Sequence, residues 1–168
     1  MIIYNNLKIK EKHKNNIVAI GNFDGIHLGH QKVLKQAKIK SKKEGLPFGL
    51  ITFEPMPVMF FNSKVKNHRI NQLNQKINQL KKFKLDFLVV VKFNKKFSLL
   101  SAEYFIKKII KDKIQSKYIF VSKNFRYGKN RKGNIKLLKN YEKKLGYKTI
   151  ITSPLKGLKR TISSTIIR

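Results

Sequence analysis

Short apolar runs alternate with longer helical patterns along most of the chain, and this alternation constrains the fold more than any other feature. Runs that are apolar at successive positions are typical of strands buried on both faces, as in a parallel sheet. Five such runs, rich in Ile, Val and Phe, span residues 17–21, 48–53, 86–93, 117–122 and 147–152. A further short strand is expected before the polar segment 5–16.

Helical patterns separate these runs. They begin near Gly29, Ile70, Ser101 and Asn134. Ser101 is a favourable N-cap, and Gly146 follows the last pattern as a C-cap glycine does. Strands joined by crossover helices predict an α/β fold with a doubly wound, mostly parallel sheet, formed by a single domain over residues 1–168.

The turn 21–30, GNFDGIHLGH, directly follows the first of the five buried runs. In a doubly wound sheet, ligands bind beyond the carboxyl ends of the strands, which is where this turn is expected. Gly21, Gly25 and Gly29 allow a tight or positive-φ backbone and the close approach of a ligand. Free amides and the start of the following helix would then form an anion site.

Two histidines, His27 and His30, lie three residues apart in this turn. They are close enough to face one phosphate together, where positioned donors stabilise developing charge. Histidines near helix starts are also often structural, and the turn alone does not decide between these interpretations. With no cysteine in the chain and only Asp24 nearby, the pair makes a poor metal site.

The formal charge of +31 suggests attraction to a polyanion such as nucleic acid. However, the lysines are spread along the whole chain, and Lys, Asn, Ile and Phe are enriched together, which is the composition that adenine- and thymine-rich codons produce. We therefore expect a solvated basic surface and no dedicated nucleic-acid partner. No apolar run is long enough to cross a membrane and no signal peptide is recognisable, which favours a cytoplasmic protein.

Several segments together resemble one family. GNFDGIHLGHQ resembles the first signature of the HxGH nucleotidyltransferase superfamily, and specifically that of the adenylyltransferase module of bacterial bifunctional riboflavin kinase/FAD synthetases. Four further segments resemble that module in the same order: ITFEPMPVMFF, FSLLSAEYFIKKII, VSKNFRYGKNRKG and ISSTIIR. The resemblance implies a Rossmann-like fold and the transfer of AMP from ATP to FMN, which gives FAD and pyrophosphate. It also implies Mg²⁺ bound with ATP and few or no protein ligands to the metal.

By motif position, the resemblance implies three sets of site residues. The catalytic residues would be His27, His30 and Arg168. The ATP-binding residues would be these three together with Gly21, Phe23, Asp24, Gly25, Gly29, Ser163, Ser164 and Thr165. The flavin-binding residues would be Pro55, Met56, Pro57, Phe61, Phe105, Asn124 and Tyr127. Phe105 equally fits a core position, because it lies on a helical apolar stripe.

Two of the chain's departures from the family pattern bear most on function. Met56 stands where the family usually has histidine, which removes a hydrogen-bonding ring from the substrate loop. The sequence ends at Arg168, and the riboflavin kinase domain is therefore expected to be absent. Two alternatives remain at this point: an HxGH transferase with another acceptor, or a basic nucleic-acid-binding protein that has kept the fold with weak catalysis.

Overall fold

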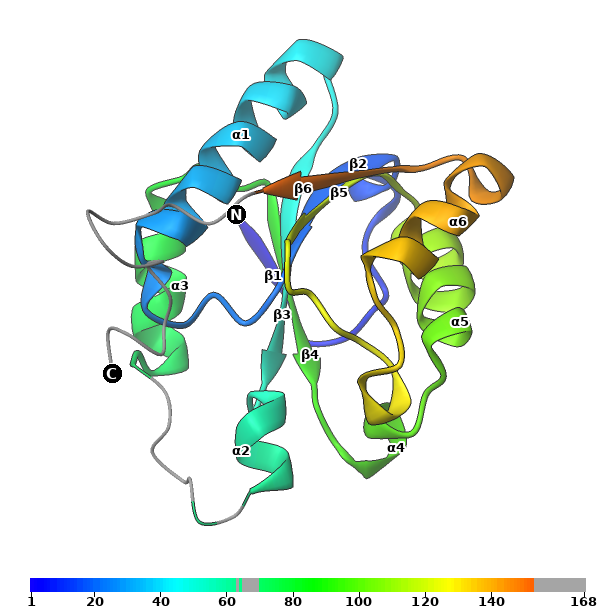
Figure 1. Cartoon of the computed structure of the whole chain (residues 1–168). Helices are drawn as coiled ribbons and strands as arrows, with labels where there is room; N and C mark the ends of the chain where they lie inside the picture. The colour runs from blue at the N-terminus through cyan, green and yellow to red at the C-terminus, as the bar shows by residue number, and fades with distance from the viewer. Residues whose placement is uncertain (63, 65–69, 153–168) are drawn as a thin grey trace, which may run out of the picture.

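The computed structural model describes residues 1–62, 64 and 70–152, and within these residues six strands form one parallel sheet (Figure 1). The strands are β1 (Ile2–Tyr4), β2 (Asn16–Ile20), β3 (Phe48–Glu54), β4 (Phe87–Lys92), β5 (Ser116–Ser122) and β6 (Lys148–Thr152). The helices are α1 (Leu28–Glu44), α2 (Pro57–Phe61), α3 (Leu73–Lys81), α4 (Lys95–Ser98), α5 (Ala102–Tyr104) and α6 (Ile135–Leu145). A π-helical segment, Phe105–Ile114, continues α5.

The helices cover both faces of the sheet (Figure 1). On one face, Leu34 of α1 and Leu80 of α3 pack in a core with sheet residues such as Leu50. On the other face, Ile106 of the π-helical segment and Leu138 of α6 belong to a second core. Successive strand residues are buried against opposite cores, which explains why the strands are apolar throughout.

The strand order is β1-β4-β3-β2-β5-β6, and the order in which the chain adds strands changes side between β2 and β5. The chain moves outward from β2 through β3 to β4, and then crosses back to place β5 on the other side of β2. Such a switch point opens a crevice at the carboxyl ends of the two strands, because the connections from them turn to opposite faces. The segments after β2 and β5 therefore meet at this crevice.

The predicted doubly wound α/β fold is confirmed, and the predicted strands agree with the structure to within about one residue at most ends. The predicted caps are also present. The Ser101 hydroxyl accepts a hydrogen bond from the Tyr104 N–H at 3.0 Å. The Asn134 side chain accepts one from the Leu137 N–H at 2.9 Å, and Gly146 ends α6 with a φ of 72°.

Three local expectations need correction. The second helix begins at Leu73 and not near Ile70, because Gln72 and Gln75 form a capping box that starts it there. The predicted loop after β3 contains the short helix α2, with Pro57 in its first turn. α4 was not predicted; its N-cap is Asn94, whose side chain accepts from the Phe97 N–H at 2.9 Å. Within the described residues, no helix is long and apolar enough to cross a membrane.

Candidate active site

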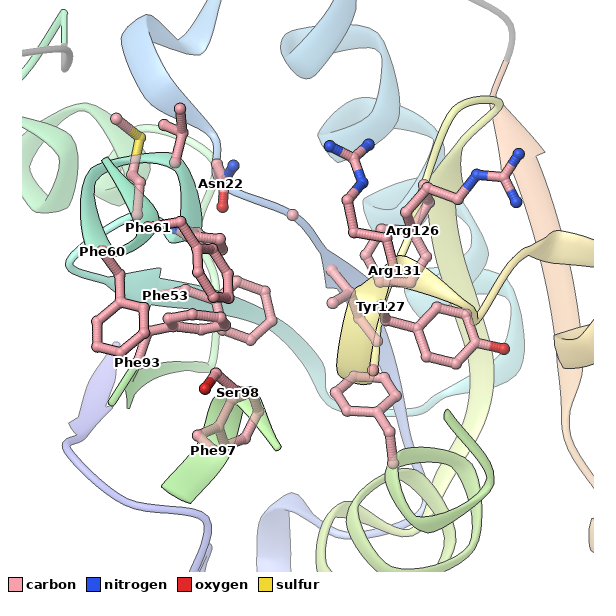
Figure 2. Close-up of a pocket in the computed structure, with 18 of the residues that line it drawn as sticks. Asn22, Phe53, Phe60, Phe61, Phe93, Phe97, Ser98, Arg126, Tyr127 and Arg131 are labelled. Carbon is pink, nitrogen blue, oxygen red and sulfur yellow. The ribbon is translucent and has the colours of Figure 1, made fainter. Parts of the chain in front are cut away.

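A cavity of about 1140 Å³ lies at the carboxyl ends of the strands, at the switch point of the sheet. Its walls come from the segments that follow β2, β3, β4 and β5, together with the start of α1. Figure 2 shows aromatic side chains on two opposite sides of this pocket. Segments far apart in the sequence thus line one cavity.

The turn after β2 reaches α1 through a single 3-10 turn, Asp24–Ile26. Phe23 has a left-handed backbone, with φ 49° and ψ 38°, and Gly25 has φ 73°. A Cβ on Gly25 would lie 2.9 Å from the Cδ1 of Ile70, so this position requires glycine both for its φ and for its packing. The turn is therefore held in one conformation by its neighbour.

The two histidines lie against each other at the start of α1. His27 is the N-cap residue, and its Nδ1 accepts a hydrogen bond from the His30 N–H at 3.4 Å. The two rings stack with centroids 3.8 Å apart, and the ring of Phe23 lies 4.9 Å from that of His30. The Nδ1 of His30 is buried and has no hydrogen-bond partner among the described residues.

Both histidines are neutral at pH 7 in this structure. Burial, followed by electrostatic interactions with His27 and with the ammonium of Lys76, lowers the pKa of His30 to about 3. Burial also lowers the pKa of His27, although the carboxylate of Asp24 opposes that shift. The rings therefore supply hydrogen-bond donors and acceptors to an incoming anion, and not a fixed positive charge.

The carboxylate of Asp24 connects the turn to the segment that precedes α3. It is buried, and its oxygens accept hydrogen bonds from the Ile70 N–H at 2.8 and 3.0 Å and from the Asn71 N–H at 3.2 Å. These hydrogen bonds join the turn to the residues directly before α3. Asp24 thus has a structural function in the turn, in addition to lining the cavity.

One side of the cavity is a cluster of five phenylalanines, which we call the phenylalanine wall. Its members are Phe53, Phe60, Phe61, Phe93 and Phe97. Neighbouring ring centroids lie 5.1–6.2 Å apart, mostly edge to face, which is the favoured geometry of aromatic pairs. Phe61 is 67% exposed, so the wall presents apolar surface to the cavity and to solvent.

Aromatic rings also line the opposite side of the cavity. Tyr127 lies 5.1 Å from Phe105 and 5.4 Å from Phe125, measured between ring centroids. The Tyr127 hydroxyl donates a hydrogen bond to the Asn134 carbonyl at 3.0 Å, and burial raises the pKa of this phenol, which therefore stays neutral. A planar aromatic ligand could lie between these rings and the phenylalanine wall, with polar atoms near the turn.

Most of the sequence-predicted residues that lie in the described part of the chain line this cavity. They are Gly21, Phe23, Asp24, His30, Met56, Pro57, Phe61, Phe105, Asn124 and Tyr127. Four others lie beside the lining residues without lining the cavity themselves: Gly25, His27, Gly29 and Pro55. The remaining predicted residues lie outside the described residues: Ser163, Ser164, Thr165 and Arg168.

The sequence did not single out several residues that line the cavity. Among them are the other phenylalanines of the wall and the basic residues Arg126 and Lys95. Phe53 and Phe93 end strands that are predicted to be buried on both faces, and the sequence does not separate an apolar residue that lines a cavity from one in the core. Phe61 is the wall residue that the sequence did single out, and its high exposure is visible only in the structure.

Among the described residues, no group of three or more His, Asp, Glu or Cys side chains could hold a metal ion.

The sequence model of a family described as FAD synthetase matches residues 9–166. Two curated relatives are bifunctional riboflavin kinase/FMN adenylyltransferases. The one from Buchnera aphidicola subsp. Schizaphis graminum is 44% identical over 95% of this chain and 52% of its own length. The one from Escherichia coli K12 is 30% identical over 90% of this chain and 49% of its own length. The chain thus spans about half the length of these relatives.

Two solved structures have the same fold. A crystal structure of a protein described as a macrolide-efflux protein from Streptococcus pneumoniae superposes with a TM-score of 0.81 and 27% identity, and covers 99% of this chain and 55% of that one. Pantoate-beta-alanine ligase from Francisella tularensis, crystallised with an ATP analogue and beta-alanine, gives a TM-score of 0.64 at 17% identity, over 99% of this chain and 72% of that one. The second likeness supports the fold alone.

Proposed function

The chain belongs to the FAD synthetase family, and on this basis we propose that it transfers the AMP group of ATP to the phosphate of FMN. The products are FAD and pyrophosphate. The observation that carries the proposal is that one cavity combines a histidine turn at a helix N-terminus with two aromatic walls. A helix N-terminus with histidines suits the phosphates of ATP, and aromatic walls suit a planar isoalloxazine ring.

In the proposed reaction, an oxygen of the FMN phosphate attacks the α-phosphorus of ATP in line. The bond from that phosphorus to the oxygen that bridges to the β-phosphate breaks, and pyrophosphate leaves with the electron pair. The nucleophile is already ionised at neutral pH, so no general base is required. The protein then acts by positioning the reactants and stabilising charge.

We assign the phosphate contacts to the turn and to the start of α1. His30 and His27, which are neutral in this structure, would donate hydrogen bonds to the phosphates together with free backbone amides. Their pKa values would rise when a phosphate dianion arrives, because a nearby negative charge favours the imidazolium form. By motif position, Ser164 and Arg168 would contact the leaving pyrophosphate.

We assign the isoalloxazine to the space between Tyr127 and the phenylalanine wall. Asn124 would hydrogen-bond a polar edge of the ring, and Met56, which is 2% exposed, would contact it through an apolar side chain. A methionine adapts its shape to an aromatic ligand but donates no hydrogen bond. Mg²⁺ would accompany ATP and be bound by its phosphates, because that ion commonly keeps substrate oxygens as ligands.

The direct test is FAD formation by the purified protein from ATP, MgCl₂ and FMN, measured by chromatography with fluorescence detection. Riboflavin in place of FMN should give no product, because it lacks the attacking phosphate. A His27→Ala or His30→Ala variant should slow FAD formation by about 10²–10³-fold, as the loss of a charge-stabilising donor does. Absence of FAD from the unmodified protein, or equal rates in these variants, would contradict the proposal.

A further inference from the structure

A buried lysine lies directly behind the histidine turn. Lys76 belongs to α3 and is only 2% exposed. Its ammonium donates hydrogen bonds to the backbone carbonyl of Asn22 at 2.7 Å and to the hydroxyl of Thr52 at 3.3 Å. The Thr52 hydroxyl in turn donates to the same carbonyl at 3.0 Å. Two donors from two different elements thus converge on one carbonyl oxygen of the turn.

The position of Lys76 in its helix makes its charge unusual. It lies on the side of α3 that also carries the buried Leu80 and the partly buried Leu73 and Ile77. An apolar side chain would fill this position at lower cost, since an ammonium is expensive to bury even when it is hydrogen-bonded. The lysine is therefore explained better by what it does to the turn than by its contribution to the core.

The hydrogen bonds from Lys76 and Thr52 determine which side of the Asn22–Phe23 peptide group faces the cavity. The peptide between Asn22 and Phe23 is trans, so its carbonyl and its N–H point in opposite directions. With the carbonyl of Asn22 held toward Lys76 and Thr52, the Phe23 N–H points away from them. No described residue accepts a hydrogen bond from this N–H, and both Asn22 and Phe23 line the cavity.

The backbone of Phe23 indicates that this orientation is imposed. A non-glycine residue with φ 49° and ψ 38° is uncommon, and such backbone persists where the surroundings hold it. Backbone amides that turn outward from a left-handed position form anion-binding concavities. The positive charge of Lys76 also acts at the neighbouring ring, because it contributes, after burial and His27, to the lowered pKa of His30.

We propose that Lys76 is the positioning residue of the phosphate-binding turn: it holds the Asn22 carbonyl away from the cavity, directs the Phe23 N–H toward bound phosphate, and places a buried positive charge behind it. This inference rests on the proposed function, because it assigns phosphate to the turn. It gives the site the fixed cation that the neutral histidines do not provide.

The test compares Lys76→Met, which removes the charge but keeps the length of the side chain, with two controls on the same helix. Lys81→Met removes an exposed positive charge, and Leu80→Ala shortens a core side chain of the same helix that makes no hydrogen bond to the turn. Calorimetry with ATP and with inorganic triphosphate should show binding about tenfold weaker or more in Lys76→Met, as expected for a lost charge-assisted hydrogen bond. Both controls should stay within twofold of the unmodified protein.

Riboflavin binding, followed by flavin fluorescence, should stay unchanged in Lys76→Met, whereas general damage to the cavity would weaken it as well. If Lys76→Met does not fold, Thr52→Val removes one of the two donors to the same carbonyl and should weaken triphosphate binding severalfold. Triphosphate binding equal to that of Lys81→Met, or parallel loss of triphosphate and riboflavin binding, overturns the inference. If the unmodified protein forms no FAD but still binds triphosphate more tightly than Lys76→Met does, the proposed function is refuted and the inference about Lys76 stands.

Discussion

Gly128 lines the cavity where the loop after β5 meets the start of α5, and its replacement by alanine should displace this part of the wall. The residue has a φ of 73°, and a Cβ there would lie 2.7 Å from the backbone N and Cα of Ala102. Because both contacts are with backbone, no side-chain rotation relieves them. The next residue, Lys129, donates its N–H to the Leu100 carbonyl at 2.7 Å, which fixes the loop to the same place.

The expected magnitude has two parts. A left-handed backbone costs a non-glycine residue about 1–2 kcal/mol. In addition, ordinary contact begins near 3.4 Å, so the loop has to move by about 0.7 Å to accept the Cβ of Gly128→Ala. Tyr127 directly precedes Gly128, Phe125 lies three residues before it, and both should move with it. We therefore expect a loss of at least about 2 kcal/mol in the free energy of unfolding and a several-fold lower affinity for riboflavin.

Gly146→Ala is the matched control. Gly146 has nearly the same φ, 72°, but nothing lies within 4 Å of its Cβ position. This variant should lose only the backbone contribution, about 1 kcal/mol, which corresponds to about 2–4 °C in Tm for a chain of this size. Thermal denaturation and flavin fluorescence measure both quantities. Equal losses of stability, or riboflavin binding that is unchanged in Gly128→Ala, would refute the assignment of this loop as a wall of the cavity.

Two further predictions follow from the site. The pKa of His30 in the folded state, about 3, lies below its unfolded value of about 6.5; the unfolded state therefore binds a proton first as the pH falls, and stability is present above pH 6.5 and lost below it. His30→Gln should remove about 2 kcal/mol of the stability lost between pH 7 and pH 5 in urea titrations, and an unchanged pH dependence would contradict the buried neutral ring. Phe93 contacts the other four rings of the phenylalanine wall, so Phe93→Ala should weaken riboflavin binding about tenfold with ATP binding unchanged. Phe83→Ala, at the end of α3 and away from the wall, is its control, and equal losses in the two variants would argue against the wall as a flavin surface.

The sequence predicted the larger elements because their signals are local. Uninterrupted apolar runs identify buried parallel strands, and the caps at Ser101 and Asn134 depend on hydrogen bonds within one turn of a helix. The short helices α2 and α4 carry too few residues to show a helical period, although α2 begins at Pro57 and α4 has Asn94 as its N-cap. The π-helical form of Phe105–Ile114 was also not predicted, since its apolar spacing is that of an ordinary helix.

The candidate site was predictable where its residues are contiguous. The turn 21–30 contains its glycines and histidines within ten residues, and the fold places it where strand order predicts a ligand. The sequence did not indicate the charge state of the histidines. Burial lowers the pKa of both rings, and for His30 the neighbouring His27 and then Lys76, which is 46 residues away in the sequence, lower it further.

The position of Lys76 in the sequence already departs from the apolar pattern of α3, but this departure could not be interpreted from the sequence alone. Its position on the apolar side of α3, in line with Leu73 and Leu80, conflicts with the helical pattern. In a chain with 39 basic residues, however, one lysine on a helix is no anomaly, because a side chain of that length can extend to solvent. Only the contact with Asn22 distinguishes a buried ammonium from an extended one, and that contact depends on how α3 packs against the turn. Basic composition thus hid one buried ammonium beside the turn among many lysines that face solvent.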